Sequence, residues 1–435
     1  MSKLEELAEL GQAIWVDYIR RTFITSGELQ RLAEQGVRGV TSNPSIFEKA
    51  IAGSDDYDET LSELAAQDLS VAEIYEALAF EDIRAAADTL RPVYDETGGA
   101  DGYVSLEVSP TLAHDSEGTI AEARRLYSTL DRPNVMIKVP ATPAGMPAIE
   151  TLIGEGINVN VTLMFSLDHY EAVTEAYITG LERLVQAGGD PSQVASVASF
   201  FLSRIDTVVD RALDEMGEDE LQGKIAIASA KVTYARFGEI FRGERWAALA
   251  ARGARAQRPL WASTSTKNPD YPDTMYVDSL IGPHTVNTVP PQTLTAYLDH
   301  GLVARTLEEG SDEAKSQLAR LVELGVDLEA LTDTLQVEGV EAFAQSFESL
   351  MESIAAKRAR IRADGQKESA SLGIYGSAVE AALASLDEQK VADRIWRRDH
   401  TLWKPEPGEI ANRLGWLETA AAMREQVGPL EELAQ

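Results

Sequence analysis

Residues 135–140 form the stretch Val135-Met136-Ile137-Lys138-Val139-Pro140, in which one lysine stands among apolar and β-branched residues. Such a short apolar run is typical of a strand that is buried on both faces of a sheet. A lysine held there would lose its hydration, which favours the neutral amine that can form a Schiff base with a carbonyl substrate. The alternative is a lysine that extends to water at a strand edge or pairs with a carboxylate. This segment alone does not decide between them.

Seven further short apolar stretches accompany this one. They cover residues 13–18, 37–41, 103–108, 158–163, 194–201, 259–262 and 285–289. Segments with helical periodicity lie between most of them, and one begins with Ser70-Val71-Ala72-Glu73, which has the form of a capping box. Eight strands that alternate with helices predict a parallel sheet that closes into an (α/β)8 barrel of the TIM type.

The chain changes character towards its C-terminus. We expect the barrel to occupy residues 1–352 and residues 353–435 to form a C-terminal extension with additional helices. This extension begins with a basic helical segment, continues through a stretch with Ser and Gly, and ends in an aromatic segment that contains Pro.

The composition limits the classes of function. Asp and Glu number 71 against 39 Lys and Arg, so the formal net charge is −32. This charge argues against a surface that binds nucleic acid or an anionic membrane, but it is compatible with a small basic pocket for a phosphorylated metabolite. No apolar run approaches the roughly 18–20 residues of a membrane span, and the polar N-terminus does not resemble a signal peptide. We therefore expect a cytoplasmic protein.

Several catalytic chemistries have no support in the sequence. Cysteine is absent, which removes disulfides and thiolate chemistry. The five histidines are scattered without the spacing of metal ligands, and no glycine-rich phosphate loop follows a strand. We expect neither a metal nor a cofactor, so catalysis would rely on Lys, Asp, Glu, Asn, Ser, Tyr or water.

Polar residues occur where the predicted strands end, and in a barrel these ends converge on one site. The candidates are Asp17, Thr41, Asn43, Glu107, Lys138, Asn160, Thr162, Ser199, Arg204, Ser263, Ser265 and Lys267. Each has a simpler explanation, because Asp17 could cap a helix, Asn43 could belong to a turn and Arg204 could be a surface cation. Their shared position at strand ends within apolar surroundings favours a functional site.

Five segments carry a resemblance to the transaldolase family. They are AIWVD (13–17), GVTSNPS (39–45), VMIKVPAT (135–142), GINVNVTL (156–163) and ASFFLSR (198–204). The match runs in order over roughly residues 1–350, and the spacing agrees as well. The resemblance implies a class I aldolase-type barrel that transfers a dihydroxyacetone unit between phosphorylated sugars in the non-oxidative pentose phosphate pathway.

The resemblance also implies three catalytic roles. Lys138 would form the Schiff base with fructose 6-phosphate or sedoheptulose 7-phosphate. Asp17 would accept the C4 hydroxyl proton as the C3–C4 bond breaks and return it when the acceptor aldehyde adds. Glu107 would act through a water during formation and dehydration of the carbinolamine.

The remaining candidates would bind the substrate. By the same resemblance, Asn43 and Asn160 would hydrogen-bond the dihydroxyacetone fragment, and Thr41 and Thr162 would position a water or the carboxylates. Ser199 would support the site and Arg204 would bind phosphate. Phe201 fits both a pocket wall and a core aromatic.

One segment departs from the family pattern. Some transaldolases carry a serine and an arginine close together after the seventh strand, whereas residues 261–269 contain Lys267 as their only cation. Lys267 would replace the arginine as a point charge, beside Ser263 and Ser265.

Alternatives remain open. Lys231 also has apolar neighbours but lies in an alanine-rich segment with helical periodicity. The chain could be a fructose-6-phosphate aldolase-like enzyme that needs no sugar acceptor, or a catalytically silent barrel that binds sugar phosphates.

The tail carries a resemblance of its own. Residues 399–403 and 410–417 resemble the junction of transaldolase–glucose-6-phosphate isomerase fusions, which implies a fused or partner isomerase domain. The simpler alternative is a helical extension that packs on the barrel or mediates formation of a homo-oligomer.

Overall fold

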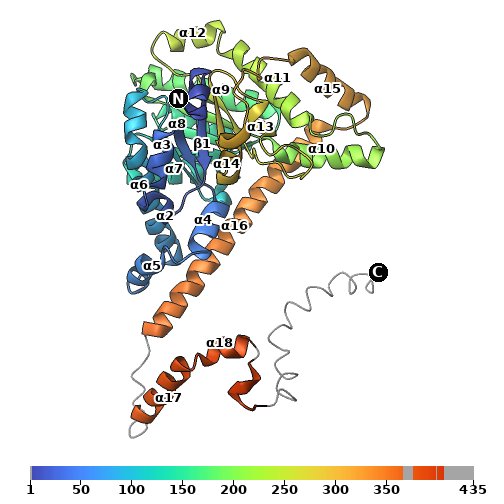
Figure 1. Ribbon diagram of the computed structural model, residues 1–435. Helices are drawn as coiled ribbons and strands as arrows, with labels where there is room; N and C mark the ends of the chain where they lie inside the picture. The colour runs from blue at the N-terminus through green and yellow to red at the C-terminus, as the bar shows by residue number, and fades with distance from the viewer. Residues whose placement is uncertain (1, 366–375, 398, 406–435) are drawn as a thin grey trace. The chain divides into compact units, whose positions relative to one another are not determined.

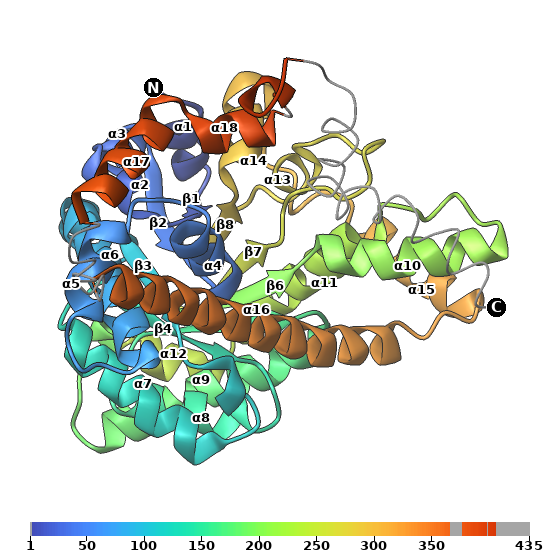
Figure 2. The same cartoon turned by 90° about the horizontal axis from the view of Figure 1, so that it is seen from below.

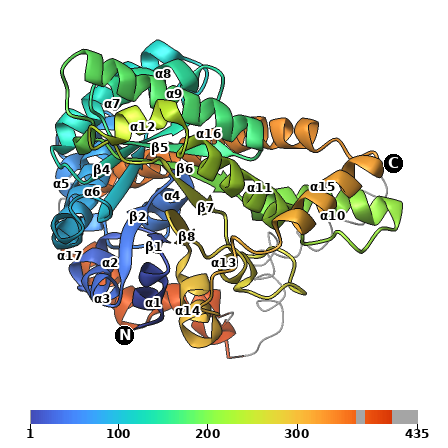
Figure 3. The ribbon, with the colours of Figure 1, turned by 90° about the horizontal axis from the view of Figure 1, so that it is seen from above.

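Eight parallel strands close into a barrel in the computed structural model, which describes residues 2–365, 376–397 and 399–405. The strands are β1 (Gln12–Asp17), β2 (Val37–Thr41), β3 (Tyr103–Glu107), β4 (Val135–Pro140), β5 (Val159–Met164), β6 (Ser196–Phe201), β7 (Arg258–Ala262) and β8 (Thr285–Val289). They neighbour one another in sequence order, and β8 pairs with β1 (Figure 3). Each strand expected from the sequence is present, with ends that differ by no more than two residues. The predicted (α/β)8 barrel is confirmed.

Helices surround this barrel (Figure 1). Up to β5 they are α1 (Lys3–Glu9), α2 (Arg21–Thr25), α3 (Glu28–Glu34), α4 (Pro44–Ala52), α5 (Asp58–Ala65), α6 (Val71–Glu96), α7 (Ser116–Leu130) and α8 (Gly145–Gly154). From β5 onwards they are α9 (Leu167–Gln186), α10 (Ser203–Met216), α11 (Ile225–Ile240), α12 (Glu244–Ala250), α13 (Met275–Asp278), α14 (Pro291–His300), α15 (Ser311–Glu323) and α16 (Leu328–Gly365). Two single turns of 3-10 helix cover Pro110–Leu112 and Pro191–Gln193. The predicted capping box starts α6, because Ser70 Oγ accepts from Glu73 N at 3.2 Å and the Glu73 carboxylate accepts from Ser70 N at 2.7 Å.

The strands are buried because side chains of the strands fill the inside of the barrel and side chains of the helices cover its outside. Trp15 of β1 and Trp261 of β7 are among the largest fully buried side chains. Trp15 requires glycine on the neighbouring strand, since a Cβ atom on Gly39 would lie 2.4 Å from its ring. This close packing fixes β1 against β2 and thereby positions the residues at their carboxyl ends.

The long helix α16 crosses the barrel at the carboxyl ends of the strands (Figure 2). Its Gln336 Nε2 donates to the carbonyl oxygens of Ala141 and Leu163, at 2.8 and 3.1 Å. Further along α16, Ser346 Oγ lies 2.7 Å from Ser45 Oγ, and Lys357 Nζ donates to Ser54 O at 2.9 Å. These contacts attach the helix to the loops around the barrel mouth.

The chain divides into two compact units, Met1–Arg362 and Ala363–Gln435. The helix α16 passes without interruption through residue 352, where we expected the barrel to end. No Gly or Pro interrupts 350–362, and Leu350 and Ile354 are fully buried in the core of the first unit. The sequence around 352 therefore changes in charge without ending the helix.

The second unit contains α17 (Gly376–Glu388), α18 (Val391–Trp396) and a turn of 3-10 helix at His400–Leu402. Additional C-terminal helices are therefore present. Arg394 Nε pairs with Asp399 Oδ2 at 2.6 Å within this unit. Residues 410–417, which carry part of the resemblance to a fusion junction, lie outside the described residues. Among the described helices of both units, none is long and apolar enough to cross a membrane.

Candidate active site

The register of three neighbouring strands places a carboxylate, an amine and an amide side by side. Glu107 of β3 is paired with Lys138 of β4, which is paired with Asn160 of β5. Lys138 Nζ lies 3.2 Å from Glu107 Oε2 and donates to Ser42 O at 2.9 Å. Both charged side chains are buried, with 5% of Lys138 and 8% of Glu107 exposed. The lysine thus pairs with a carboxylate, and that carboxylate is the second expected catalytic group.

Asp17 ends β1 next to Thr41 of β2. Thr41 Oγ1 donates to Asp17 Oδ1 at 2.6 Å and lies 2.7 Å from Thr288 Oγ1 of β8. Burial raises the pKa of the Asp17 carboxyl, while the hydrogen bond from Thr41 and the charge of Lys138 oppose this rise. Burial likewise raises the pKa of Glu107 against the opposing charge and hydrogen bond of Lys138. The site therefore contains two carboxyl groups that retain protons at higher pH than usual.

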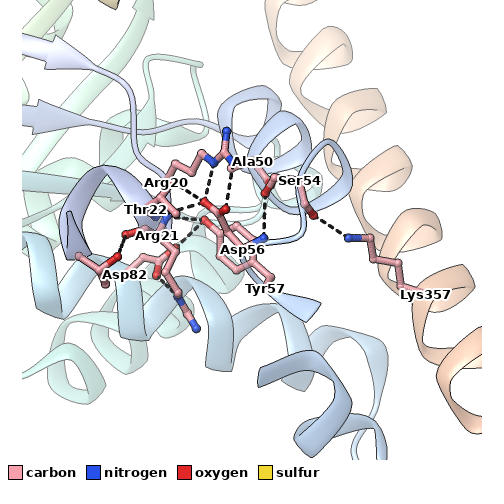
Figure 4. Close-up of polar contacts among 10 residues, drawn as sticks. Arg20, Arg21, Thr22, Ala50, Ser54, Asp56, Tyr57, Asp82 and Lys357 are labelled. Carbon is pink, nitrogen blue, oxygen red and sulfur yellow. Dashed lines mark hydrogen bonds and ion pairs between the residues drawn. The ribbon is translucent and has the colours of Figure 1, made fainter. Parts of the chain in front are cut away.

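A polar network holds the loop that follows Asp17 (Figure 4). Arg20 forms a two-pronged ion pair with Asp56 at 2.6 and 2.9 Å. Arg21 Nε donates to Asp82 Oδ1 at 2.9 Å, and Tyr57 Oη donates to the other Asp82 oxygen at 2.8 Å. Because these partners lie on α6 and between α4 and α5, the network fixes the end of β1 relative to two neighbouring helices.

Most of the predicted site residues line one cavity of about 290 Å³ at the carboxyl ends of the strands. Those present are Asp17, Thr41, Asn43, Lys138, Asn160, Thr162, Ser199, Phe201, Arg204, Ser263 and Lys267. Glu107 does not line it but approaches Lys138 from an adjoining cavity. Ser265 does not line it either, and instead accepts a hydrogen bond from Lys267 Nζ at 2.8 Å. These two residues therefore contact cavity residues, Lys138 and Lys267, without lining the cavity themselves.

The two asparagines are held in defined orientations. Asn160 donates from Nδ2 to Ser105 Oγ at 3.0 Å and accepts at Oδ1 from Ser199 Oγ at 2.7 Å. Asn43 Oδ1 caps α4 by accepting from Ile46 N at 2.9 Å, so its Nδ2 stays available to the cavity. Thr162 Oγ1 is buried without a hydrogen-bond partner among the described residues. These groups can donate to or accept from the hydroxyls of a small polar ligand.

Three cations besides Lys138 line the cavity: Arg204, Lys267 and Lys49. Arg204 lies over the rings of Phe201 and Phe343, at 5.6 and 5.9 Å from their centroids. Partial burial lowers the pKa of Lys267, and the charges of Arg204 and Lys49 lower it further. None of these cations forms an ion pair with a carboxylate in the described part of the chain, although acidic residues far outnumber basic ones. Like charges collected without acidic partners indicate an anionic ligand.

Six residues that were not predicted also line this cavity, namely Ser45, Ile46, Lys49, Ala262, Thr288 and Phe343, and the unpredicted Ser105 accepts from Asn160. Thr288 is the last but one residue of β8 and could have been found as another polar residue near a strand end. Lys49 lies within α4, and Phe343 lies on α16 far along the chain, so neither has a strand-end position to indicate it. Phe201 is both a core aromatic and part of the pocket wall, since it is buried and also lines the cavity.

Lys231, the competing lysine, lies on α11 and does not line this cavity. Its Nζ donates to Glu309 O at 2.8 Å. The described residues contain no group of three or more His, Asp or Glu side chains arranged to hold a metal ion.

Comparisons with known proteins agree with this geometry. The family model "Transaldolase/Fructose-6-phosphate aldolase" matches residues 14–354. The chain is similar to transaldolase 2 of Nostoc sp., with 50% identity over 372 residues that cover 82% of this chain and 98% of the relative. It is also similar to the transaldolase of Thermobifida fusca, with 50% identity over 359 residues that cover 81% of this chain and 98% of the relative. With an eight-stranded barrel and a buried lysine at its mouth, the chain belongs to the transaldolase/fructose-6-phosphate aldolase family.

Proposed function

We propose that this chain is a transaldolase, a transferase that moves a dihydroxyacetone unit through a Schiff base on Lys138. The donor would be fructose 6-phosphate or sedoheptulose 7-phosphate, and the acceptor erythrose 4-phosphate or glyceraldehyde 3-phosphate. The observation that supports this most strongly is the buried Lys138 amine, which lies 3.2 Å from Glu107 and shares a cavity with Asp17. Relatives at 50% identity that are named transaldolases add to this support.

Glu107 serves the first half of the reaction. The Lys138 amine, once it has given up its proton, attacks C2 of the ketose and forms a carbinolamine. Glu107, through a water, then supplies the proton with which the C2 hydroxyl leaves, so that one water is released and the imine forms. The raised pKa of Glu107 suits this role, because it favours the protonated carboxyl that must donate. Thr162, whose hydroxyl lines the substrate cavity without a partner among the described residues, would hold a water on the substrate side.

Asp17 serves the carbon–carbon bond. It accepts the proton of the C4 hydroxyl while the C3–C4 bond breaks. The electron pair of the C3–C4 bond moves toward the imine and forms an enamine on Lys138. The aldose product leaves, an acceptor aldehyde enters, and the enamine carbon attacks it. Asp17 then returns the proton to the new alkoxide. The hydrogen bond from Thr41 orients the carboxylate for both transfers.

The remaining residues bind the sugar and its phosphate. Asn43 and Asn160 hold the hydroxyls of the dihydroxyacetone unit, and Ser199 fixes the amide of Asn160. Arg204, Lys267 and Lys49 bind the phosphate, with Ser263 beside them and Ser265 positioning Lys267.

Trapping of the Schiff base tests this function. The protein is incubated with fructose 6-phosphate, reduced with borohydride, and the adduct is mapped by mass spectrometry. We expect the adduct on Lys138 and none on Lys231, and its absence from Lys138 would contradict the proposal. A silent sugar-phosphate binder would form no adduct at all.

The requirement for an acceptor separates transfer from simple cleavage, which the family description also includes. A transaldolase should form glyceraldehyde 3-phosphate from fructose 6-phosphate only when erythrose 4-phosphate is supplied. Steady formation of glyceraldehyde 3-phosphate and free dihydroxyacetone without an acceptor would favour the aldolase instead.

For residues 353–435 we propose a helical extension whose part beyond the first unit, from Ala363 onwards, mediates self-association. The family match ends at residue 354, and Val379 and Leu383 of α17 are exposed apolar residues. Sedimentation of a Leu383→Glu variant beside the unaltered chain tests this, since a smaller assembly is expected for the variant. A fused or partner isomerase domain is the alternative prediction. If residues 353–435 are a helical extension only, the purified chain should not convert fructose 6-phosphate to glucose 6-phosphate.

A further inference from the structure

A second cavity, of about 210 Å³, lies behind the catalytic pair. It is bounded by β3, α4, α6, α7 and α16, and Glu107 forms part of its lining together with Tyr75, Glu76 and Glu122. The only residue that it shares with the substrate cavity, among the described residues, is Asn43. Glu107 therefore has Lys138 on one side and this second cavity on the other.

Among the described residues, Lys138 is the only polar group that approaches the Glu107 carboxylate. Neither of its buried oxygens accepts a well-aligned hydrogen bond from a described residue, although Lys138 Nζ is 3.2 Å away. A buried carboxylate in this state is unstable unless polar groups approach it. The second cavity is the space from which a small polar molecule can do so.

The outer end of the cavity reaches the surface between α6 and α7. Ala72 is exposed there, and Glu76 and Glu122 are partly exposed. Both carboxylates are held in place, because Arg125 pairs with Glu76 and the backbone N–H of Ser109 donates to Glu122 at 3.0 Å. The cavity thus has a polar rim of fixed geometry.

Aromatic rings form part of the cavity wall. The ring of Tyr75 stands edge-on to Phe47 and to Phe347, with centroids 5.9 and 5.5 Å away. This aromatic packing holds Tyr75 in the cavity wall, and the volume of about 210 Å³ suits small molecules such as water. A sugar phosphate would instead use the substrate cavity, where the cations lie.

The chemistry of the proposed function requires a second route. Each catalytic cycle releases one water when the carbinolamine becomes the imine and consumes one water when the imine is hydrolysed. At both steps the covalently bound sugar occupies the substrate cavity. We propose that the second cavity is a water passage that binds the reacting water at Glu107 and exchanges it with solvent without displacing the sugar. This inference rests on the proposed Schiff-base function.

Oxygen exchange tests the passage directly. Fructose 6-phosphate labelled with ¹⁸O at C2 loses its label to water each time the imine forms and is hydrolysed, and mass spectrometry measures the rate. Ala72→Trp should obstruct the outer end and slow label loss several-fold, with a similar decrease in kcat and an unchanged KM for erythrose 4-phosphate. Ala79 lines another part of the cavity wall, and Ala79→Val should narrow the cavity there. This variant should slow label loss less than Ala72→Trp does.

The matched control is Ala248→Trp, an exposed alanine of α12 that lines neither cavity. It should exchange oxygen as the unaltered protein does. If both cavity variants fold, as judged by circular dichroism, and exchange at the control rate, water uses the substrate mouth and the passage is refuted. If the unaltered protein neither exchanges label nor forms a borohydride adduct, the proposed function itself fails.

Discussion

Lys138 Nζ lies 3.2 Å from Glu107 Oε2 because β3 and β4 pair these two residues in register. Two neighbouring strands thus fix the separation of amine and carboxylate through backbone hydrogen bonds, with no flexible loop between them. Such a placement keeps reacting groups within hydrogen-bond reach and lowers the entropic cost of reaching the transition state. The barrel provides the catalytic geometry directly.

Substitution of Lys138 should separate its chemical role from its structural role. Lys138→Met removes the nucleophile and leaves Glu107 buried without its counter-charge. We expect loss of transfer and of the borohydride adduct, together with destabilisation of up to about 3–5 kcal/mol, as for other broken buried pairs. Urea unfolding and adduct mapping measure the two effects.

Lys138→Arg serves as the control for this prediction. The guanidinium keeps the positive charge beside Glu107 but does not form a Schiff base, so the variant should be inactive and more stable than Lys138→Met. An adduct at another lysine in either variant would show that Lys138 is not the nucleophile.

The acid side of the pH profile should depend on Asp17. Burial raises the pKa of this carboxyl above its usual 3.8. Only the carboxylate can accept the C4 proton, so kcat should fall as the pH decreases through the raised pKa, at higher pH than for an exposed aspartate. Asp17→Asn should lose transfer and still form the borohydride adduct, because imine formation does not use Asp17.

Substitution of Thr41 tests whether Asp17 is the group that titrates, because it should move the pKa of Asp17 in a known direction. Its hydrogen bond lowers the pKa of Asp17, so Thr41→Val should raise that pKa and move the acid limb of the kcat profile to higher pH. A limb that stays in place or moves to lower pH would exclude Asp17 as the titrating group.

Phosphate recognition should depend on Lys49 as well as on Lys267. Lys49→Met removes one of three cations on the cavity wall, and a loss of about 1.4 kcal/mol would raise KM for fructose 6-phosphate about tenfold at unchanged kcat. Transfer from unphosphorylated fructose to unphosphorylated erythrose should not change, which distinguishes phosphate binding from a general defect. Lys224→Met, an exposed lysine that lines none of the cavities described here, is the control. Equal KM changes for both sugars would contradict the assignment.

The strands and most of the site follow from local sequence patterns. Short β-branched runs such as 135–139 and 285–289 predict buried strands because no helix of that length would be stable between turns. Once eight such strands are placed in a barrel, their carboxyl ends converge, and polar residues there fall into one cavity. This is why Asp17, Asn160 and Arg204 could be identified together.

The parts that were not predicted depend on contacts between distant segments. Phe343 reaches the cavity because α16 crosses the barrel mouth, which no local pattern specifies. Lys49 faces the cavity because Asn43 caps α4 and sets the direction of that helix. The second cavity behind Glu107 arises from the packing of α4, α6 and α7, and the sequence gives no signal for such a space.

Asp206 is expected to make the stability of the protein depend on pH. Its carboxyl accepts from Ala226 N at 2.8 Å and from Tyr276 Oη at 2.7 Å, and so joins α10, α11 and α13. Burial raises its pKa from 3.8 to about 7, and the two hydrogen bonds only partly oppose this rise. The folded state therefore keeps a proton that the unfolded state loses between these values.

The sign of this effect follows from the protons bound in each state. The unfolded chain binds fewer protons in this interval, so the free energy of unfolding should decrease as pH rises, by up to about 1.4 kcal/mol per pH unit. Asp206→Asn removes the titrating group and should flatten the dependence, as measured by urea unfolding at several pH values. Asp219→Asn, an exposed aspartate near the end of the same helix, should leave the slope unchanged. An equal slope in the Asp206→Asn variant would mean that Asp206 is already ionised throughout this range, with its two hydrogen bonds sufficient to stabilise the buried charge.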